Sequence, residues 1–242
     1  MRVLVIGATS AIAQAVCRKL SRAAVYLVAR DRERLSAVRD DLVARGVEVS
    51  AAEAVDFLAA GALGSAIRAA NDALGGIDLA LVAHGTLPDQ ALCLASEDQT
   101  RYALDVNAVS VIGALTILGE VFEPQGRGTI AVISSPAGDR GRQSNYVYGA
   151  AKSAVSVFAQ GFRDRLHGAG VTVLTIKPGF VSTPMTSGFQ KGSLWVEPDR
   201  IAEDVLRAVR RGKSVCYSPW YWRYIMLMVQ LMPGFLLRRL GI

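Results

Sequence analysis

The sequence predicts an α/β protein built on a parallel β-sheet with helices on both faces. Short, mostly β-branched apolar runs alternate with amphipathic segments from one end of the chain to the other. Such alternation favours a parallel sheet with right-handed crossovers. Glycines stand where the helices should stop, and the chain shows no linker, low-complexity tract or internal repeat. We therefore expect a single domain.

Seven apolar runs are short and continuous, as in strands that are buried on both faces. They are residues 3–6, 25–29, 47–51, 79–83, 129–134, 171–176 and 214–217. Six intervening or following segments have the composition of helices, namely residues 11–22, 32–45, 59–74, 99–122, 144–167 and 198–211. We place the domain at residues 1–218 and treat residues 219–242 as an apolar C-terminal tail.

The bulk composition argues against several classes of partner. The formal charge is +6, but Lys and Arg are scattered and not interleaved with aromatics, so we expect no nucleic-acid partner. Cys17, Cys93 and Cys216 lack metal-ligand spacing, so we expect no metal site. The first motif begins at Val3, which leaves no room for a signal peptide, and we expect a reducing, cytoplasmic location. A mean hydropathy of +0.30 indicates buried sheets, a subunit interface or contact with lipid.

The first predicted strand runs directly into a turn that suits a phosphate. Gly7-Ala8-Thr9-Ser10 leads into a helix, so backbone N–H groups and the helix N-terminus converge where a pyrophosphate binds. Gly7 permits the tight turn, and Thr9 or Ser10 can cap the helix or donate hydroxyls to phosphate. Ala11 and Ala13 stand where the pattern usually has further glycines, so we expect the phosphates to lie slightly further out.

The second predicted strand ends in Ala29-Arg30-Asp31. An acid directly at this strand end would bind the ribose diol and repel a 2′-phosphate. The forked guanidinium of Arg30 favours NADP over NAD instead. The alternative is a solvated arginine at the start of a helix. After the third strand, Asp56 could accept a hydrogen bond from an adenine amino group, with Phe57 alongside.

Tyr148 and Lys152 lie four residues apart in a predicted helix, so their side chains share one helix face. A cation there lowers the pKa of a phenol from about 10 toward working pH, as a general acid or base requires. Such a pair also occurs by chance on solvated helices, so the pair alone does not decide between the two.

Further segments match a known pattern in order and spacing. Ser134-Ser135-Pro136-Ala137-Gly138 ends the fifth strand, Asn107 lies in the helix before it, and Pro178-Gly179-Phe180-Val181-Ser182-Thr183 follows the sixth. With Gly7-Ala8-Thr9-Ser10 and Tyr148-Gly149-Ala150-Ala151-Lys152, these segments resemble the short-chain dehydrogenase/reductase family over nearly the whole chain. The resemblance implies a Rossmann-type, doubly wound parallel sheet of seven strands.

The resemblance also implies a catalytic tetrad of Asn107, Ser135, Tyr148 and Lys152. In the reduction direction, Ser135 would hold the substrate carbonyl and Tyr148 would protonate its oxygen. Lys152 would bind the nicotinamide ribose and depress the pKa of Tyr148, and Asn107 would position a water. The hydride comes from the cofactor, which we expect to be NADP(H).

The expected cofactor contacts are Gly7, Thr9, Ser10, Ile12, Arg30, Asp56, Phe57, Ala83, Gly85, Tyr148, Lys152, Pro178, Gly179, Val181 and Thr183. One segment departs from the family pattern, because Ala83-His84-Gly85 replaces the usual Asn-Ala-Gly after the fourth strand. We assign His84 no chemical role. We expect the substrate pocket to be lined by Asp139, Arg140 and Arg142 and by residues 185–196.

The tail combines aromatic residues with an apolar helix. Pro219-Trp220-Tyr221-Trp222-Arg223-Tyr224 precedes residues 225–232, and its longest uncharged stretch is shorter than the ~20 residues of a spanning helix. The tail suits an interfacial membrane contact or a lid over a lipid-linked substrate. An oligomer interface is the equal alternative.

The sequence therefore predicts an NADPH-dependent ketone or aldehyde reductase. A looser resemblance to the decaprenylphosphoryl-2-keto-ribose reductase branch favours a hydrophobic or lipid-linked keto-sugar substrate. The alternatives are an NAD(P)-dependent alcohol dehydrogenase, a non-catalytic NADP-binding regulator, and a membrane-associated subunit that needs a partner. We expect a homodimer or homotetramer, with the helices at residues 99–122 and 144–167 available for pairing across a two-fold axis.

Overall fold

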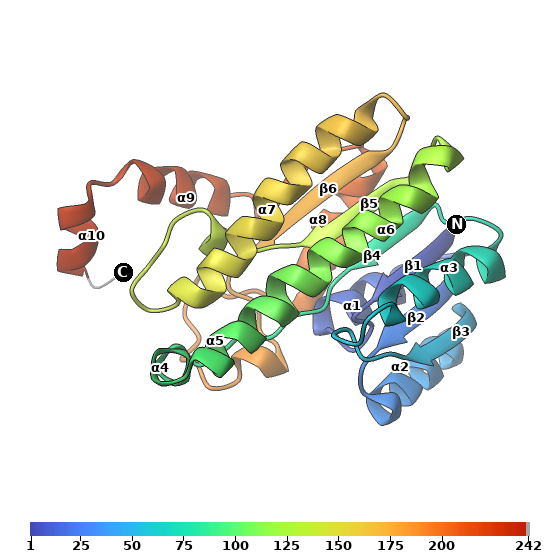
Figure 1. Cartoon of the computed structure of the whole chain (residues 1–242), viewed down its shortest axis with the longest axis horizontal. Helices are drawn as coiled ribbons and strands as arrows, with labels where there is room; N and C mark the ends of the chain where they lie inside the picture. The colour runs from blue at the N-terminus through green and yellow to red at the C-terminus, as the bar shows by residue number, and fades with distance from the viewer. Residues whose placement is uncertain (241–242) are drawn as a thin grey trace.

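Within the residues that the structure describes, seven parallel strands form a single sheet in the order β3-β2-β1-β4-β5-β6-β7 (Figure 1). The computed structural model describes the backbone of residues 1–240 and their side chains except those of 237, 238 and 240. The last two residues of the predicted tail, 241 and 242, lie outside it. The strands are β1 (Arg2–Ile6), β2 (Ala24–Ala29), β3 (Glu48–Ala54), β4 (Leu79–Val82), β5 (Thr129–Ile133), β6 (Thr172–Pro178) and β7 (Val215–Ser218). The predicted doubly wound α/β fold is confirmed.

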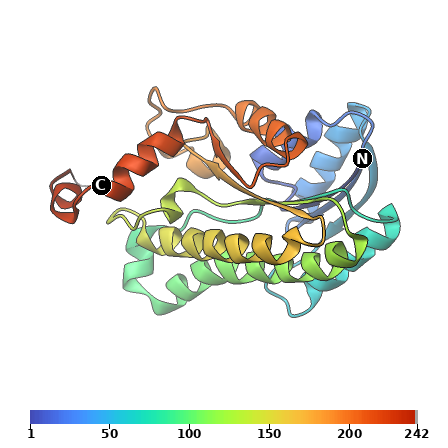
Figure 2. The ribbon, with the colours of Figure 1, turned by 90° about the horizontal axis from the view of Figure 1, so that it is seen from above.

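Two layers of helices cover the sheet, and Figure 2 shows them on opposite sides of it. The helices are α1 (Ala11–Arg18), α2 (Arg32–Ala44), α3 (Ala62–Leu74), α4 (Gln90–Ala95), α5 (Glu97–Leu104), α6 (Ser110–Gln125), α7 (Tyr146–His167), α8 (Pro198–Arg210), α9 (Trp222–Leu231) and α10 (Gly234–Leu240). One core lies between the sheet and α1, α2 and α8. The other lies between the sheet and α3, α6 and α7.

The alternation of side chains in each central strand supplies both cores. In β1, Val3 and Val5 face the α1 side, whereas Leu4 and Ile6 face the α6 side, and all four are fully buried. The predicted burial on both faces is wrong for β3. It pairs only with β2 at the edge of the sheet, and most of its residues are partly exposed. An edge strand has a neighbouring strand on one side only, so its other side lies open to solvent.

Two predicted helix ends differ from the structure. The helix predicted at residues 11–22 ends at Arg18, and Arg22 takes a left-handed φ of 54° in the connection to β2. The helix predicted at residues 59–74 begins only after Gly61, which has a φ of 74°. Left-handed backbone cannot lie within a right-handed helix, so Arg22 and Gly61 stand outside α1 and α3. The α1 helix ends earlier than Arg22, at a C-cap on Lys19.

The helix predicted at residues 99–122 is interrupted. The α5 and α6 helices are joined by a π turn at Asp105–Val109, and the short α4 helix was not predicted. By length and composition Glu97–Gln125 could cross a membrane, but half of its most apolar window is buried. A core helix of this fold passes the same test, so the segment does not indicate a membrane span.

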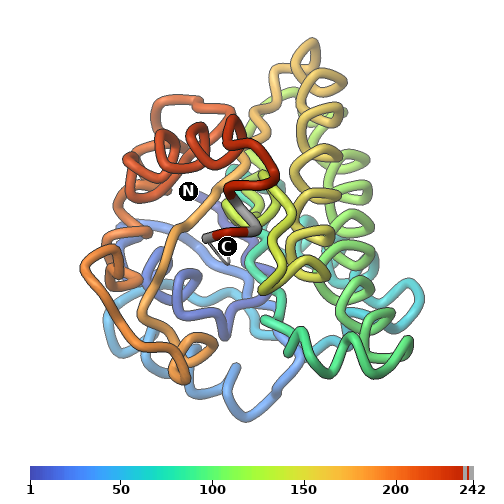
Figure 3. The backbone as a smooth tube through the Cα atoms, turned by 90° about the vertical axis from the view of Figure 1, so that its left-hand side faces the viewer, coloured from blue at the N-terminus to red at the C-terminus, as the bar shows by residue number. Residues whose placement is uncertain are grey.

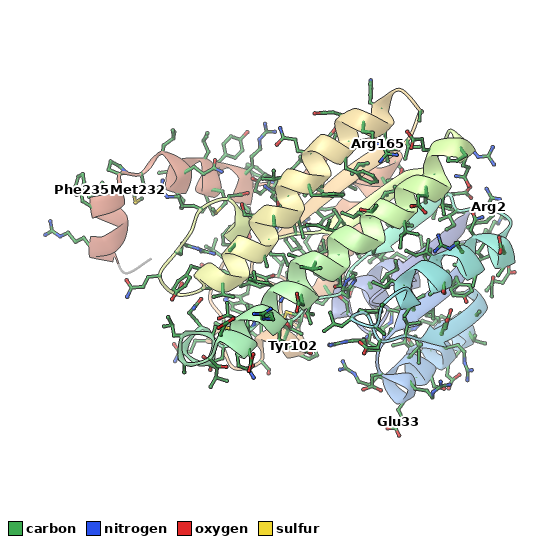
Figure 4. The ribbon with its side chains drawn as sticks, in the orientation of Figure 1. Arg2, Glu33, Tyr102, Arg165, Met232 and Phe235 are labelled. Atoms are coloured by element: carbon green, nitrogen blue, oxygen red, sulfur yellow. The ribbon has the colours of Figure 1, made fainter. Side chains whose placement is uncertain are left out.

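The tail forms an arm that leaves the body of the protein at β7. In Figure 1, α9 and α10 extend away from the sheet, Figure 3 shows the chain from the side of this arm, and Figure 4 places Met232 and Phe235 on it. Trp222 and Met226 of α9 are buried, with exposed fractions of 5% and 1%. Leu227, Met228 and Leu231 are exposed. The arm is therefore attached through one face of α9.

Candidate active site

A cavity of about 1610 Å³ lies at the carboxyl ends of the strands. In a doubly wound sheet this edge is where ligands bind, because the loops that follow the strands meet there. All the predicted catalytic and cofactor-contact residues line this one cavity, namely Gly7, Thr9, Ser10, Ile12, Arg30, Asp56, Phe57, Ala83, Gly85, Asn107, Ser135, Tyr148, Lys152, Pro178, Gly179, Val181 and Thr183. Their roles remain predictions.

The turn after β1 is held against the neighbouring strands. The backbone N–H groups of Gly7 and Ala8 both donate to Val28 O, at 2.8 and 3.0 Å. Gly7 has a φ of +87°, and an added Cβ would lie 2.4 Å from the backbone nitrogen of His84. Ser10 precedes α1 without a side-chain bond to it. Ala13 is fully buried in the core, so its methyl group points away from the cavity.

The end of β2 presents two guanidinium groups to the cavity. Arg30 Nη1 donates to the hydroxyl of Tyr102, a residue of α5, at 3.2 Å. Asp31 accepts from the backbone of Arg34 at 3.0 Å and so caps α2. Arg34, one helical turn after Arg30, also lines the cavity. The Asp31 carboxylate is therefore engaged as the N-cap of α2. Arg30 and Arg34 provide the positive charge at this part of the cavity.

His84 is buried and neutral. Its Nε2 shares a hydrogen bond with Ser110 Oγ at 3.0 Å, and Ser110 Oγ also lies 3.0 Å from Val106 O. Its Nδ1 has no hydrogen-bond partner among the described residues. Phe57 packs on the ring at 4.6 Å. Burial, with Lys152 and Arg30 nearby, lowers the pKa of His84 to about 3.

This histidine should make the protein sensitive to acid. Below about pH 6.5 the unfolded chain binds a proton on this imidazole, whereas the folded protein does so only near the lowered pKa of about 3. The contribution of the neutral His84 imidazole to the free energy of unfolding is therefore fully present above the pKa of the unfolded chain and is lost as the pH falls toward the pKa of the folded protein. We expect His84→Asn to reduce the loss of unfolding free energy between pH 7 and 4.5 by on the order of 2 kcal/mol.

Urea unfolding at a series of pH values measures this effect. His167, the other histidine of the chain, is exposed, and His167→Asn provides the control for removal of an imidazole. Parallel pH profiles for the wild-type protein and His84→Asn would show that His84 is not buried in a neutral form.

Tyr148 and Lys152 point into the same buried region. Lys152 Nζ lies 5.8 Å from the centre of the Tyr148 ring and donates to Ile133 O at 3.1 Å. Burial lowers the pKa of Lys152 to about 8. The expectation of a lowered phenol pKa is not met. Burial raises the pKa of Tyr148 to about 12, and a hydrogen bond with Ser135 acts in the opposite direction.

Asn107 lies in the π turn and is fully buried. Its Oδ1 accepts from the backbone of Thr86 at 2.9 Å, and its Nδ2 donates to Ala103 O at 2.9 Å. A Cβ on Gly85 would lie 2.8 Å from Asn107 Oδ1 and 3.5 Å from Lys152 Nζ. The side chain of Asn107 thus joins the helix to the segment after β4. π turns of this kind frequently accompany functional sites.

The prediction that Asp139 and Arg140 line the substrate part of the cavity is wrong. Asp139 is 3% exposed, pairs with Lys177 and accepts from the Tyr217 hydroxyl at 2.7 Å. Arg140 donates to Gln230 O of α9 at 2.7 Å. These contacts fasten the loop after β5 to the strands and to α9. Arg142 of the same loop does line the cavity, as predicted.

An aromatic wall closes another side of the cavity. Phe180 stacks on Trp195 with ring centres 5.3 Å apart and meets Trp222 edge-on at 4.9 Å. Met185, Phe189 and Trp195 from the predicted segment 185–196 contribute to the lining. The α9 residue Trp222 was not anticipated. Its indole occupies the space beside Gly179, where an added Cβ would lie 1.8 Å from Trp222 Nε1.

The residues present fit a dinucleotide with a nicotinamide end. Gly7 and Gly85 leave a cradle that side chains would fill, Arg30 and Arg34 supply positive charge, and His84 Nδ1 has no partner among the described residues. The sequence singled out His84 without giving it a chemical role, and it missed Arg34, Gln90, Asn145 and Trp222. Of these four, Arg34 carried a signal, because it follows Arg30 by four residues.

Comparisons with known proteins agree with this geometry. Residues 1–193 match the family model described as short chain dehydrogenase. The chain is 36% identical over 242 residues to an uncharacterized oxidoreductase of Mycobacterium tuberculosis, covering 98% of this chain and 96% of the relative. It is 34% identical over 244 residues to another from Streptomyces coelicolor, with 98% and 94% covered.

Two solved structures have the same fold. One is actinorhodin polyketide ketoreductase with NADPH, at a TM-score of 0.80, 23% identity, and coverage of 89% of this chain and 94% of that one. The other is a short chain dehydrogenase from Mycobacterium paratuberculosis bound to NAD. Its TM-score is 0.78 at 22% identity, and the match covers 88% of this chain and 94% of that one. At these identities the likeness concerns the fold alone.

Proposed function

The chain belongs to the short-chain dehydrogenase family, and we propose that it reduces a ketone or aldehyde with NADPH. It is an oxidoreductase with a nicotinamide-cofactor fold. The observation that carries the proposed reaction is the convergence of Ser135, Tyr148 and Lys152 beside one cavity at the carboxyl edge of the sheet. The hydroxyls of Tyr148 and Ser135 share a hydrogen bond there, so both can reach one carbonyl oxygen, as polarising and protonating it requires.

The residues divide the chemistry as follows. The bound nicotinamide supplies the hydride. Ser135 holds the carbonyl oxygen, and Tyr148, whose pKa is raised to about 12 by burial, is protonated at neutral pH and can donate. Lys152, with a pKa of about 8, remains mostly charged at pH 7 and stabilises the phenolate left behind. Asn107 keeps the helix and the segment after β4 together beside these groups.

The preference for NADPH rests on Arg30 and Arg34, since a 2′-phosphate pairs well with guanidinium groups. We expect Arg30→Ala to raise the Kd for NADPH about tenfold and to leave the Kd for NADH unchanged, because one charged contact is lost. Fluorescence titration of the nucleotides measures both constants.

Arg32→Ala is the matched control, because Arg32 begins α2 as an exposed residue outside the cavity lining. A wild-type protein that binds NADH as tightly as NADPH would refute the NADPH assignment, whichever carbonyl compounds it reduces.

The arm formed by α9 and α10 supports a hydrophobic, lipid-linked substrate. It exposes Leu227, Met228 and Leu231 together with Arg223 and Arg239, which suits a membrane surface with anionic headgroups. A homodimer through α6 and α7 would cover the exposed Val157 of α7 and Val109, which directly precedes α6.

Flotation with phosphatidylglycerol vesicles tests the membrane contact. Truncation is unsuitable, because it would remove Trp222 from the cavity. We expect the triple variant Leu227→Ser, Met228→Ser and Leu231→Ser to lose vesicle binding and to keep its affinity for NADPH. The control Leu94→Ser changes an exposed leucine of α4 instead. Equal flotation of the two variants would contradict the arm as the contact.

A further inference from the structure

The cavity collects the unpaired polar atoms of the protein. Among the described residues, five buried side-chain atoms lack a hydrogen-bond partner: His84 Nδ1, Gln90 Nε2, Arg142 Nε, Asn145 Oδ1 and Trp222 Nε1. All five belong to residues that line the cavity. Buried polar groups are almost always paired in folded proteins, so their concentration at one place marks positions where a ligand completes them.

Three of the five lie around the start of α7: Arg142 and Asn145 come shortly before it in the chain, and Gln90 contacts its second residue. Gln90 begins α4, and its Oε1 accepts from the backbone of Val147 at 3.1 Å. That bond fixes the amide, so Nε2 is left as a donor. Asn145 directly precedes α7, and its side chain makes no bond that caps the helix. These two amides and Arg142 therefore border the substrate side of the cavity.

Arg142 is the informative member of this group. Within the described part of the chain its guanidinium forms no ion pair and no hydrogen bond. The nearest carboxylate in the loop, Asp139, is already occupied by Lys177 and Tyr217. Burial lowers the pKa of Arg142. A partly buried guanidinium is normally matched by an anion, since desolvating its charge is costly.

Phe180, Trp195 and Trp222 form an apolar aromatic cluster in the lining of the same cavity. The indole Nε1 of Trp222 lies against Gly179 and has no hydrogen-bond partner among the described residues. A ring or other apolar portion of a substrate would pack on this cluster. The lining thus contains a cationic, polar part and an aromatic part.

We propose that the substrate is an anionic carbonyl compound whose carboxylate or phosphate is bound by Arg142 and the Gln90 amide. Its apolar portion packs on Phe180 and Trp222. The inference rests on the proposed function for the identity of the reacting group, but the anion site itself does not depend on turnover. Asn145 Oδ1, an acceptor, then pairs with a hydroxyl group of the substrate.

Binding is tested first, with quenching of the intrinsic tryptophan fluorescence of the full-length protein. The probes are 4-(hydroxymethyl)benzoate and its methyl ester, which differ only in the charge. We expect the wild-type protein to bind the carboxylate about tenfold more tightly than the ester, as one charge-assisted pair provides. Arg142→Gln should reduce this ratio to about one without weakening the ester. Arg140→Gln removes the same charge from the same loop and should keep the ratio.

Turnover is tested next, with NADPH and the aldehydes 4-formylbenzoate, its methyl ester, 4-formylphenyl phosphate and 4-methoxybenzaldehyde. We expect lower KM values for the two anions, and Arg142→Gln should raise them. Equal wild-type affinity for acid and ester, or a preference that survives in Arg142→Gln, would overturn the anion site. A preserved binding ratio without reduction of any aldehyde would support the anion site and refute carbonyl reduction.

Discussion

Tyr148→Phe should lower kcat for NADPH-dependent carbonyl reduction by about a thousandfold, as loss of a positioned general acid does. The substitution removes one hydroxyl and keeps the ring that Lys152 faces at 5.8 Å. The Kd for NADPH should stay within about twofold, since the ring still fills its place in the cavity. Steady-state loss of NADPH absorbance and a fluorescence titration give the two numbers.

A matched control lies two residues earlier. Tyr146 is the first residue of α7 and is 41% exposed, so Tyr146→Phe should retain wild-type kcat. If Tyr148→Phe turned over at more than a tenth of the wild-type rate, Tyr148 would not be the proton donor. If it failed to bind NADPH, the loss of activity would have a structural cause instead.

Gly7→Ala should destabilise the fold strongly, by about 3 kcal/mol or more. The residue has a φ of +87°, and the new Cβ would lie 2.4 Å from His84 N and 2.8 Å from Ala83 C. Those atoms are backbone and cannot move aside, because Ala83 N donates to Ile6 O at 2.7 Å and joins β4 to β1. Strain and overlap therefore add at the centre of the sheet.

Gly46→Ala separates the two contributions. Gly46 has a similar φ of +78°, but nothing lies within 4 Å of its added Cβ, so we expect a loss of only about 1 kcal/mol from the backbone strain. Urea unfolding compares the variants. Should Gly7→Ala be no less stable than Gly46→Ala, the close approach of the turn to β4 would not constrain residue 7.

The sequence allowed the order of strands and helices to be predicted because the signal is local. Each apolar run, and each glycine at a helix end, reports on its own segment. The predicted site residues also meet at one cavity, since a parallel sheet brings the ends of its strands to a common edge. The same local signal extended the helix at residues 11–22 through Arg22, whose left-handed backbone only the structure shows.

The features that were missed depend on distant parts of the chain. Trp222 reaches the cavity because it packs beside Gly179. The residues around Trp222 and those around Gly179 give no sequence signal that the two segments are in contact. Asp139 leaves the cavity because Lys177 and Tyr217 hold it. The pKa of Tyr148 is raised by burial and lowered by a hydrogen bond with Ser135, and the spacing of residues along a helix reports neither.

The π turn at Asp105–Val109 makes the length of this helix as consequential as its composition. A π turn holds one residue more than the α-helix requires, so deleting a single codon here would yield a regular helix. The helices on either side would keep nearly the same orientation, because the π turn absorbs the extra residue within about one turn. The loss would be local, since Asn107 lies in this turn and its bonds to Thr86 and Ala103 depend on the widened backbone. The extra residue therefore serves to place the Asn107 amide.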